Sequence, residues 1–264
     1  MGPLLYRVSG EERGRIKGEV KSWLFLDRII HPVKTVIFPS YCRLCSRLLE
    51  KKGEKVICSD CLELIEIHKG AVCPVCGRFY YHNYNSEFPC QDCLNDLPPF
   101  TRHRSLGAYA GRLKEIIILF KYRGYENLSR PLARLVYKYL AEDGLFSGVD
   151  FILPVPLYRK REKARGFNQA ELLARELSRL CSIPTLPGVL VKVKNTPAQV
   201  SLEASDREVN LKGAFSVRKK EKIENRTLLL VDDVFTTGST VKECALALKR
   251  AGAREVRAVT LARA

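Results

Sequence analysis

One short segment, residues 228–240 (LLLVDDVFTTGST), constrains the fold of this chain more than any other. Its first four residues form an apolar run of the kind that is buried in a parallel sheet, so Asp232 and Asp233 lie at the carboxyl end of a strand. Ligands of open α/β sheets bind at that end. The hydroxyl-rich turn 236–240 opens a helix, where unpaired N–H groups and the helix dipole favour an anion. The segment therefore predicts an α/β fold with a site for a sugar phosphate.

The same segment resembles the phosphoribosyl pyrophosphate motif of type I phosphoribosyltransferases, in which four apolar residues are followed by Asp-Asp and by Thr-Thr-Gly-x-Thr. In this interpretation Asp232 and Asp233 accept hydrogen bonds from the ribose 2- and 3-hydroxyls. A strand that ends in Asp-Asp also occurs in magnesium-binding response regulators and in plain strand-to-loop turns, but the continuation TTGST favours the phosphoribosyl interpretation. The 5-phosphate is then expected to bind to the turn formed by Thr236, Thr237, Gly238, Ser239 and Thr240.

Cysteine spacing predicts a second kind of site. Two C-x-x-C pairs bring four thiolates onto one ion and complete a closed tetrahedral zinc shell. The pairs recur after 31 or 32 residues, and the segments CSDCLE and CQDCLN repeat as well, which indicates a tandem duplication. We therefore expect two structural zinc ions whose binding supplies much of the folding free energy of this segment. The expected ligands are Cys42 with Cys45, Cys58 with Cys61, Cys73 with Cys76, and Cys90 with Cys93.

The pairing of these ligands is open at this stage. A sequential arrangement gives the first four cysteines to one ion and the last four to the other, while a cross-braced arrangement fits the same spacings. A single zinc ion and a redox-active dithiol are also compatible with C-x-x-C pairs. His68 and His82 could each replace a cysteine, but eight thiols suffice, and we expect the four histidines, His31, His68, His82 and His103, at the surface. Cys181 and Cys244 lie in apolar helical stretches and are expected in the core.

Positive charge is concentrated in the C-terminal part of the chain. The whole chain carries a formal net charge of +16, and residues 99–264 contain 31 Lys and Arg against 17 Asp and Glu. The segment 159–165 (RKREKAR) is the densest block, and it predicts either a pyrophosphate-binding loop or a salt-sensitive contact with nucleic acid. The two roles are compatible. The candidate side chains are Arg159, Lys160, Arg161 and Arg165.

Predicted strands and helices alternate along the second half of the chain. Helices are expected within 105–122 and at 129–142, 168–180 and 241–251, with strands at 151–153, 189–193, 213–217, 228–231 and 256–261. This alternation predicts a Rossmann-like, mainly parallel α/β sheet with right-handed crossovers. We divide the chain into an N-terminal extension (1–36), a double zinc ribbon (37–98) and a phosphoribosyltransferase-like domain (99–264).

Hydropathy and the charge of the N-terminal residues indicate where in the cell the protein is expected. No apolar run reaches membrane-spanning length, and the first twenty residues are too charged for a secretory leader. The protein is therefore expected in the cytoplasm, where ten cysteines are not expected to form disulfides.

The segment 194–210 is long and polar for a connection between two strands. One interpretation is a lid that closes over a reacting centre and excludes water, with Gln199, Arg207 and Asn210 as its most useful side chains. The second interpretation is a solvated flexible loop.

Several stretches taken together resemble the ComF family of competence proteins, from about residue 37 to the C-terminus: the four cysteine pairs, LFKYRG, RGFNQA, NTPAQV, LLLVDDVFTTGST and VTLARA. The resemblance implies a double zinc ribbon joined to a type I phosphoribosyltransferase domain, with a role in DNA uptake during natural transformation. It also implies that the basic segment and Asn168 approach the pyrophosphate, and that magnesium bridges substrate oxygens.

Two kinds of function follow from this resemblance. The first is an enzyme that binds phosphoribosyl pyrophosphate with magnesium and transfers ribose 5-phosphate to an unknown acceptor, with Asp232, Asp233, Gln199 and Arg207 as candidate catalytic residues. The second is a non-catalytic module that senses phosphoribosyl pyrophosphate, holds single-stranded DNA on its basic face and contacts a protein partner of the DNA-uptake machinery through the zinc ribbons.

Overall fold

A computed structural model describes residues 40–51, 53–80, 88–195 and 211–264. The chain divides into two compact units between Cys61 and Leu62. This division falls inside the segment 37–98 that we expect to be the double zinc ribbon. Gln199, Arg207, Asn210, His31 and His82 lie outside the described residues.

The described part of the first unit is a small cysteine-rich knuckle. A bridge between Tyr41 and Leu48 closes its first turn, and Cys42 N–H donates to the Arg47 carbonyl over 2.8 Å. The short helix α2 (Ser59–Glu63) begins in this unit.

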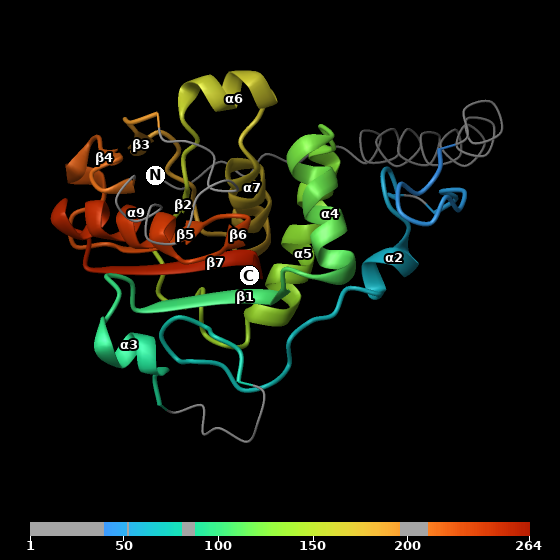
Figure 1. The fold of residues 1–264 in the computed structure, drawn as a ribbon. Helices are drawn as coiled ribbons and strands as arrows, with labels where there is room; N and C mark the ends of the chain where they lie inside the picture. The colour runs from blue at the N-terminus through green and yellow to red at the C-terminus, as the bar shows by residue number, and fades with distance from the viewer. Residues whose placement is uncertain (1–39, 52, 81–87, 196–210) are drawn as a thin grey trace, which may run out of the picture. The chain divides into compact units, whose positions relative to one another are not determined.

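The second unit is built around a parallel sheet whose main strands follow the order β1-β7-β5-β2. All the strand pairs of this sheet are parallel, which confirms the predicted sheet type. A two-residue strand, β6, follows β5 after the Asp-Asp pair and runs along the end of β7 (Figure 1). The bounds are β1 (Arg102–Ala108), β2 (Phe151–Pro154), β5 (Thr227–Val231), β6 (Val234–Phe235) and β7 (Glu255–Arg263).

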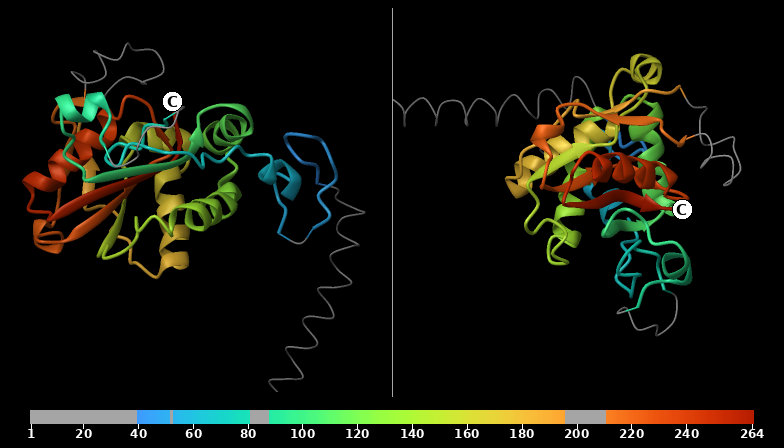
Figure 2. Two further views of the ribbon diagram at one scale, coloured as in Figure 1. Left: turned by 90° about the horizontal axis from the view of Figure 1, so that it is seen from below. Right: turned by 90° about the vertical axis from the view of Figure 1, so that its left-hand side faces the viewer.

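Helices cover both faces of this sheet. The helices α4 (Gly111–Tyr122), α5 (Ser129–Leu140) and α7 (Gln169–Cys181) lie on one face, and α9 (Ser239–Arg250) lies on the other (Figures 1 and 2). A separate antiparallel pair, β3 (Leu190–Lys192) and β4 (Phe215–Val217), lies on the face of α9. The remaining short helices are α3 (Gln91–Asn95), α6 (Arg159–Arg165) and the 3-10 turns Glu126–Leu128 and Lys220–Lys222.

The apolar run predicted from the sequence forms the central strand β5, in which all five residues are buried. Because side chains alternate across a strand, Leu228 and Leu230 pack with Val241 and Leu248 of α9, while Leu229 faces the other helix layer. Burial on both faces explains why the last four residues of this strand are all apolar.

Most predicted elements are present, with two differences. The basic segment 159–165, predicted as a loop, is the short helix α6, which ends at Gly166 in the left-handed conformation (φ +86°). It contains no buried residue, so its sequence lacks the apolar periodicity by which helices are predicted. The strands predicted at 189–193 and 213–217 pair with each other and lie outside the main sheet. No helix among the described residues is long and apolar enough to cross a bilayer.

Candidate functional site

A cavity of about 690 Å³ lies at the carboxyl ends of β2 and β5, the edge where open α/β sheets bind ligands. The Asp-Asp pair, the threonine turn, the basic helix α6 and the end of α4 all contribute to its wall. Its polar lining residues are Tyr109, Lys121, Tyr122, Arg161, Arg165, Asn168, Gln169, Lys192, Asp232, Asp233, Thr236, Thr237 and Thr240.

The turn between β6 and α9 has a conformation that requires glycine. Gly238 has φ +82°, and a Cβ atom at this position would lie 2.3 Å from Cζ of Phe235. Thr237 Oγ1 and Ser239 Oγ are hydrogen-bonded at 2.7 Å, and Ser239 is buried beneath the turn. The first N–H groups of α9 have no acceptor within the helix, so the turn offers an anion site at a helix N-terminus.

The two carboxylates of the site differ in their partners. Asp233 Oδ1 lies 2.8 Å from Nζ of Lys121, and both side chains are largely buried, with 13% and 16% of their surfaces exposed. Asp232 Oδ1 instead accepts a hydrogen bond from the Asp233 N–H over 2.8 Å. Burial opposes the charge of Lys121, but Asp233 outweighs that cost and the pKa of Lys121 is raised.

The surroundings of Asp232 also change its acidity. Burial and the charge of Asp233 raise the pKa of Asp232 to about 7, even though Lys121 and Lys192 oppose the shift. Burial, with the nearby Arg161, lowers the pKa of Lys192. Without ligand, Asp232 is thus poised between its neutral and ionised forms near neutral pH.

The basic wall of the cavity is held in place by α7 and α4. Arg165 donates to Gln169 Oε1 over 2.6 Å, and its guanidinium lies 5.3 Å from the ring centroid of Tyr122. Asn168 caps α7 by accepting from the Ala170 N–H, and its amide donates to the Val155 carbonyl. The Asn168 side chain is therefore committed to backbone partners, although it lines the cavity.

The structure brings most of the sequence-predicted phosphoribosyl residues to one cavity. Arg159 lines a neighbouring cavity of about 410 Å³ on the other side of α6, and Lys160 lines neither of the two. Sequence reasoning missed Lys121 and Lys192 as site residues. Lys121 belongs to the LFKYRG stretch of the family resemblance, which was the available signal, whereas Lys192 lies on β3 with no motif around it.

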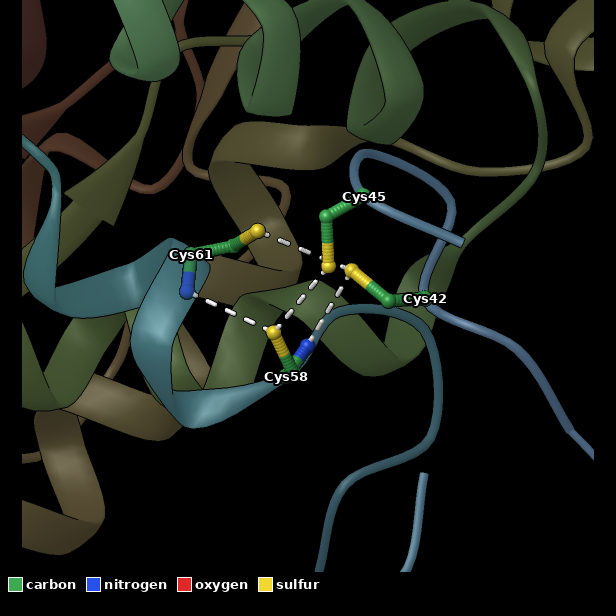
Figure 3. Close-up of side chains that lie close together, drawn as sticks. All are labelled: Cys42, Cys45, Cys58 and Cys61. Carbon is green, nitrogen blue, oxygen red and sulfur yellow. Dashed lines mark hydrogen bonds between the residues drawn. The ribbon is translucent and has the colours of Figure 1, made fainter. Parts of the chain in front are cut away.

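The eight paired cysteines form two groups of four, one in each unit. Within each group the sulfur atoms lie within 4.8 Å of one another, and the grouping is sequential rather than cross-braced. Figure 3 shows the first group, in which Cys42 and Cys61 Sγ are 3.8 Å apart and Cys45 and Cys58 Sγ are 3.6 Å apart. Tetrahedral coordination at Zn–S distances of about 2.3 Å requires sulfur separations of about 3.8 Å, so the donor sets fit zinc.

The two groups repeat the same local structure. Cys58 N–H donates to Cys42 Sγ over 3.4 Å, and Cys90 N–H donates to Cys73 Sγ over 3.3 Å. An ion pair also recurs in the two copies, between Arg47 and Asp60 and between Arg78 and Asp92. The duplication inferred from spacing is therefore present in the hydrogen bonding. His68 belongs to neither group and stacks on Phe79 at 4.0 Å. The expected surface position is wrong for His103, which is buried because both of its ring nitrogens have protein partners.

Thiol acidity within the groups also suits a cation. Burial opposes ionisation of Cys73, but N–H groups of Cys90, Cys76 and Val75 stabilise its thiolate and lower its pKa to about 6. Burial and the neighbouring charge raise the pKa of Cys93. Without a metal, the second group therefore resists full ionisation, and a divalent ion would offset half of the charge of its four thiolates.

We expect the purified protein to contain two zinc ions per chain, and Cys45→Ser or Cys76→Ser to reduce this number to about one, because three thiolates bind zinc more weakly than four. Elemental analysis after exhaustive dialysis measures the ratio. Cys181→Ser is the control and should retain both ions. A wild-type ratio near zero would refute both assignments.

Comparisons with known proteins identify two domain families in the chain. A phosphoribosyl transferase domain family matches residues 163–264, and a double zinc ribbon domain family matches residues 33–94. The chain is 37% identical over 214 residues to Competence protein F of Haemophilus influenzae, which covers 79% of this chain and 90% of that protein. It is 35% identical over 228 residues to the DNA utilization protein YhgH of Escherichia coli, with 85% and 97% covered. Identity to Competence protein ComFC of Bacillus subtilis is 29% over 220 residues, with 80% and 86% covered.

Proposed function

Because the chain belongs to the ComF family of competence and DNA-utilization proteins, which joins a double zinc ribbon to a phosphoribosyltransferase domain, we propose that its cavity binds phosphoribosyl pyrophosphate with magnesium. One observation carries the proposal: two carboxylates, a threonine-lined helix N-terminus and several cationic side chains line a single cavity at the end of the sheet. Each of these groups suits one part of a phosphorylated ribose: the carboxylates its hydroxyls, the helix N-terminus its 5-phosphate and the cations its pyrophosphate.

The ligand is oriented by the charges of the wall. The 5-phosphate binds at the turn of Thr236, Thr237 and Thr240, and the ribose hydroxyls donate to Asp232 and Asp233. The pyrophosphate lies toward α6. There the guanidinium of Arg165 forms charge-assisted hydrogen bonds, since Gln169 and Tyr122 already fix its orientation.

Magnesium fits the acidic side of the cavity, because this ion binds through one or two carboxylates together with substrate phosphates. Asp232 and Asp233 are the residues that would hold it or its water ligands. When bound, magnesium neutralises charge on the pyrophosphate.

Transfer of the ribosyl group is the reaction that this arrangement supports. The bond between the anomeric carbon and the pyrophosphate oxygen breaks, and the electron pair leaves with pyrophosphate. An acceptor nucleophile bonds to the same carbon and loses its proton to solvent water. Arg161 and Arg165 stabilise the departing charge, and the Asp pair holds the ribose in position. Gln199 and Arg207 remain proposals for the lid.

Pyrophosphate release distinguishes an enzyme from a sensing module. The protein is incubated with magnesium phosphoribosyl pyrophosphate and a panel of nucleobases, nucleosides and single-stranded DNA, and released pyrophosphate is measured. We expect release that depends on one class of acceptor. Ligand binding without release for any acceptor would instead favour the non-catalytic sensing module.

The positive charge of the second unit favours an additional role in binding single-stranded DNA, in keeping with the name DNA utilization protein of the relatives. Helix α6 contains five cationic side chains and none of its residues is buried. We propose that it contributes to this surface and that a zinc ribbon contacts a protein partner. The affinity for an oligonucleotide should fall steeply between about 50 and 200 mM salt. Salt-independent binding would contradict the DNA role.

Ligand affinity should rise with pH up to about neutrality. The pKa of Asp232 is raised to about 7, so below this pH the carboxyl is protonated and loses the negative charge that strengthens its hydrogen bond from the ribose hydroxyl. Below pH 7 the affinity should therefore fall by up to about tenfold per pH unit. Calorimetric titrations between pH 5.5 and 8.5 measure the dependence. Asp232→Asn is the control, because it should retain only the pH dependence of the ligand itself.

A further inference from the structure

The two cysteine groups differ in how they are connected to the rest of the protein. The first lies in its own compact unit, whereas the second lies in the same unit as the sheet and belongs to its apolar core. Corresponding positions show this difference. Ser46 follows the first knuckle and Gly77 follows the second, both with positive φ, and a Cβ atom at Gly77 would lie 2.5 Å from the His103 carbonyl oxygen of β1. The second knuckle is thus packed tightly against the sheet of its own unit.

One carbonyl of the second knuckle is held by two side chains of the sheet. The Cys76 carbonyl accepts a hydrogen bond from Arg263 Nη1 over 2.7 Å and lies 2.9 Å from His103 Nδ1. The other ring nitrogen of His103 lies 3.0 Å from Thr260 Oγ1. Burial lowers the pKa of His103 to about 3, so its ring is neutral, and Arg263 supplies the charged contact.

The same two side chains contact the ring that lies beneath the phosphate turn. His103 stacks on Phe235 with centroids 4.1 Å apart, and the Arg263 guanidinium lies 4.6 Å from the Phe235 centroid. Phe235 is buried, and its Cζ occupies the space where a side chain at Gly238 would begin. A continuous set of contacts therefore runs from Cys76, through His103 and Arg263, to Phe235 and Gly238.

We infer that the second cysteine group, and not the first, positions the phosphate turn 236–240 through His103, Arg263 and Phe235. A bound metal fixes the knuckle and the direction of the Cys76 carbonyl, which fixes the two side chains that support Phe235. Loss of the metal releases this support and loosens the turn. The expected effect on phosphoribosyl pyrophosphate binding rests on the proposed function. The positioning of the turn does not, because the order of the turn can be measured without a ligand.

Hydrogen exchange of the full-length protein measures the turn directly. Cys45 and Cys76 occupy equivalent places in the duplication, so Cys45→Ser and Cys76→Ser form a matched pair. In Cys76→Ser we expect the hydrogen-exchange rate of the peptide covering 236–240 to increase by about tenfold. This corresponds to a decrease of about 1.4 kcal/mol in the free energy of local opening. Restoring the metal in wild-type protein stripped by a chelator should restore protection. Cys45→Ser should leave this peptide unchanged.

A second pair of variants keeps the metal in place. Arg263→Met removes the link, while Arg257→Met removes an arginine of the same strand that donates to the carbonyls of Gly144, Leu145 and Ser147. Both variants should be less stable than wild type, but only Arg263→Met should accelerate hydrogen exchange at 236–240 and weaken the binding of magnesium phosphoribosyl pyrophosphate. Arg263→Lys should recover part of the protection, since an ammonium still donates to a carbonyl.

The outcomes separate the two proposals. The positioning role would be overturned if the two cysteine variants showed equal exchange at 236–240 and the two arginine variants also showed equal exchange there. This holds whether or not the ligand binds. Increased exchange in a protein that binds no phosphoribosyl pyrophosphate would support the positioning role and refute the proposed ligand.

Discussion

Replacing Gly238 with alanine is expected to destabilise the protein by about 3 kcal/mol and to lower its affinity for magnesium phosphoribosyl pyrophosphate by at least about tenfold. At φ +82° a residue with a Cβ atom costs about 1–2 kcal/mol. The Cβ atom would also lie 2.3 Å from Phe235, whose buried ring cannot move without disturbing its contact with His103. The turn must therefore shift, and the N–H groups of the phosphate site shift with it.

Gly252 provides the matched control at the other end of α9. It has φ +95°, but a Cβ atom there would lie 3.5 Å from Glu224, an ordinary contact distance. Gly252→Ala should therefore cost only the conformational strain, about 1–2 kcal/mol, and leave ligand affinity unchanged. Thermal unfolding and calorimetry compare the two variants. Equal ligand affinity in Gly238→Ala and wild type would contradict the role of the turn.

Replacing Asp233 with asparagine is expected to weaken ligand binding by about 100-fold, because a charge-assisted hydrogen bond to ribose is worth up to about 3 kcal/mol. The change also leaves Lys121, largely buried, without its carboxylate partner, and should destabilise the protein by about 2 kcal/mol or more. Adding Lys121→Met should recover part of the stability, since the buried ammonium that lost its partner is removed, but it should not recover affinity, because Asp232 then lacks a neighbouring cation.

Asp150→Asn is the control for a lost carboxylate. Asp150 accepts a hydrogen bond from the Thr227 N–H over 2.7 Å and pairs with Arg226, at the end of the sheet away from the cavity. Its replacement should lower stability without changing affinity. The assignment would be wrong if Asp233→Asn bound the ligand as tightly as Asp150→Asn does.

Local sequence patterns predicted the parts of the fold that depend on neighbouring residues. The run before Asp232 is buried on both faces, so its apolar character alone identifies the central strand. The cysteine pairs are equally local, because each knuckle positions its own thiolates and repeats at a fixed interval. The spacing allowed both a sequential and a cross-braced grouping of the cysteines. The structure shows the sequential one, because the sulfur atoms of consecutive pairs lie close together.

The parts that were missed depend on tertiary contacts. Lys121 and Asp233 are separated by more than 100 positions and meet only because α4 ends beside the carboxyl end of β5. The helical state of 159–165 has no apolar face to indicate it. The need for glycine at position 77, where the first knuckle has Ser46, is explained only by the packing of the second knuckle against His103.

Isothermal titration of magnesium phosphoribosyl pyrophosphate into the zinc-loaded, full-length protein at pH 7.5 tests the central claim most directly. At this pH Asp232 is largely ionised. Binding to about one site per chain is expected, with the heat lost in Asp233→Asn and retained in Asp150→Asn. The absence of heat from folded wild-type protein containing both metal ions, or equal binding by wild type and Asp233→Asn, would contradict a phosphoribosyl site at the Asp-Asp pair.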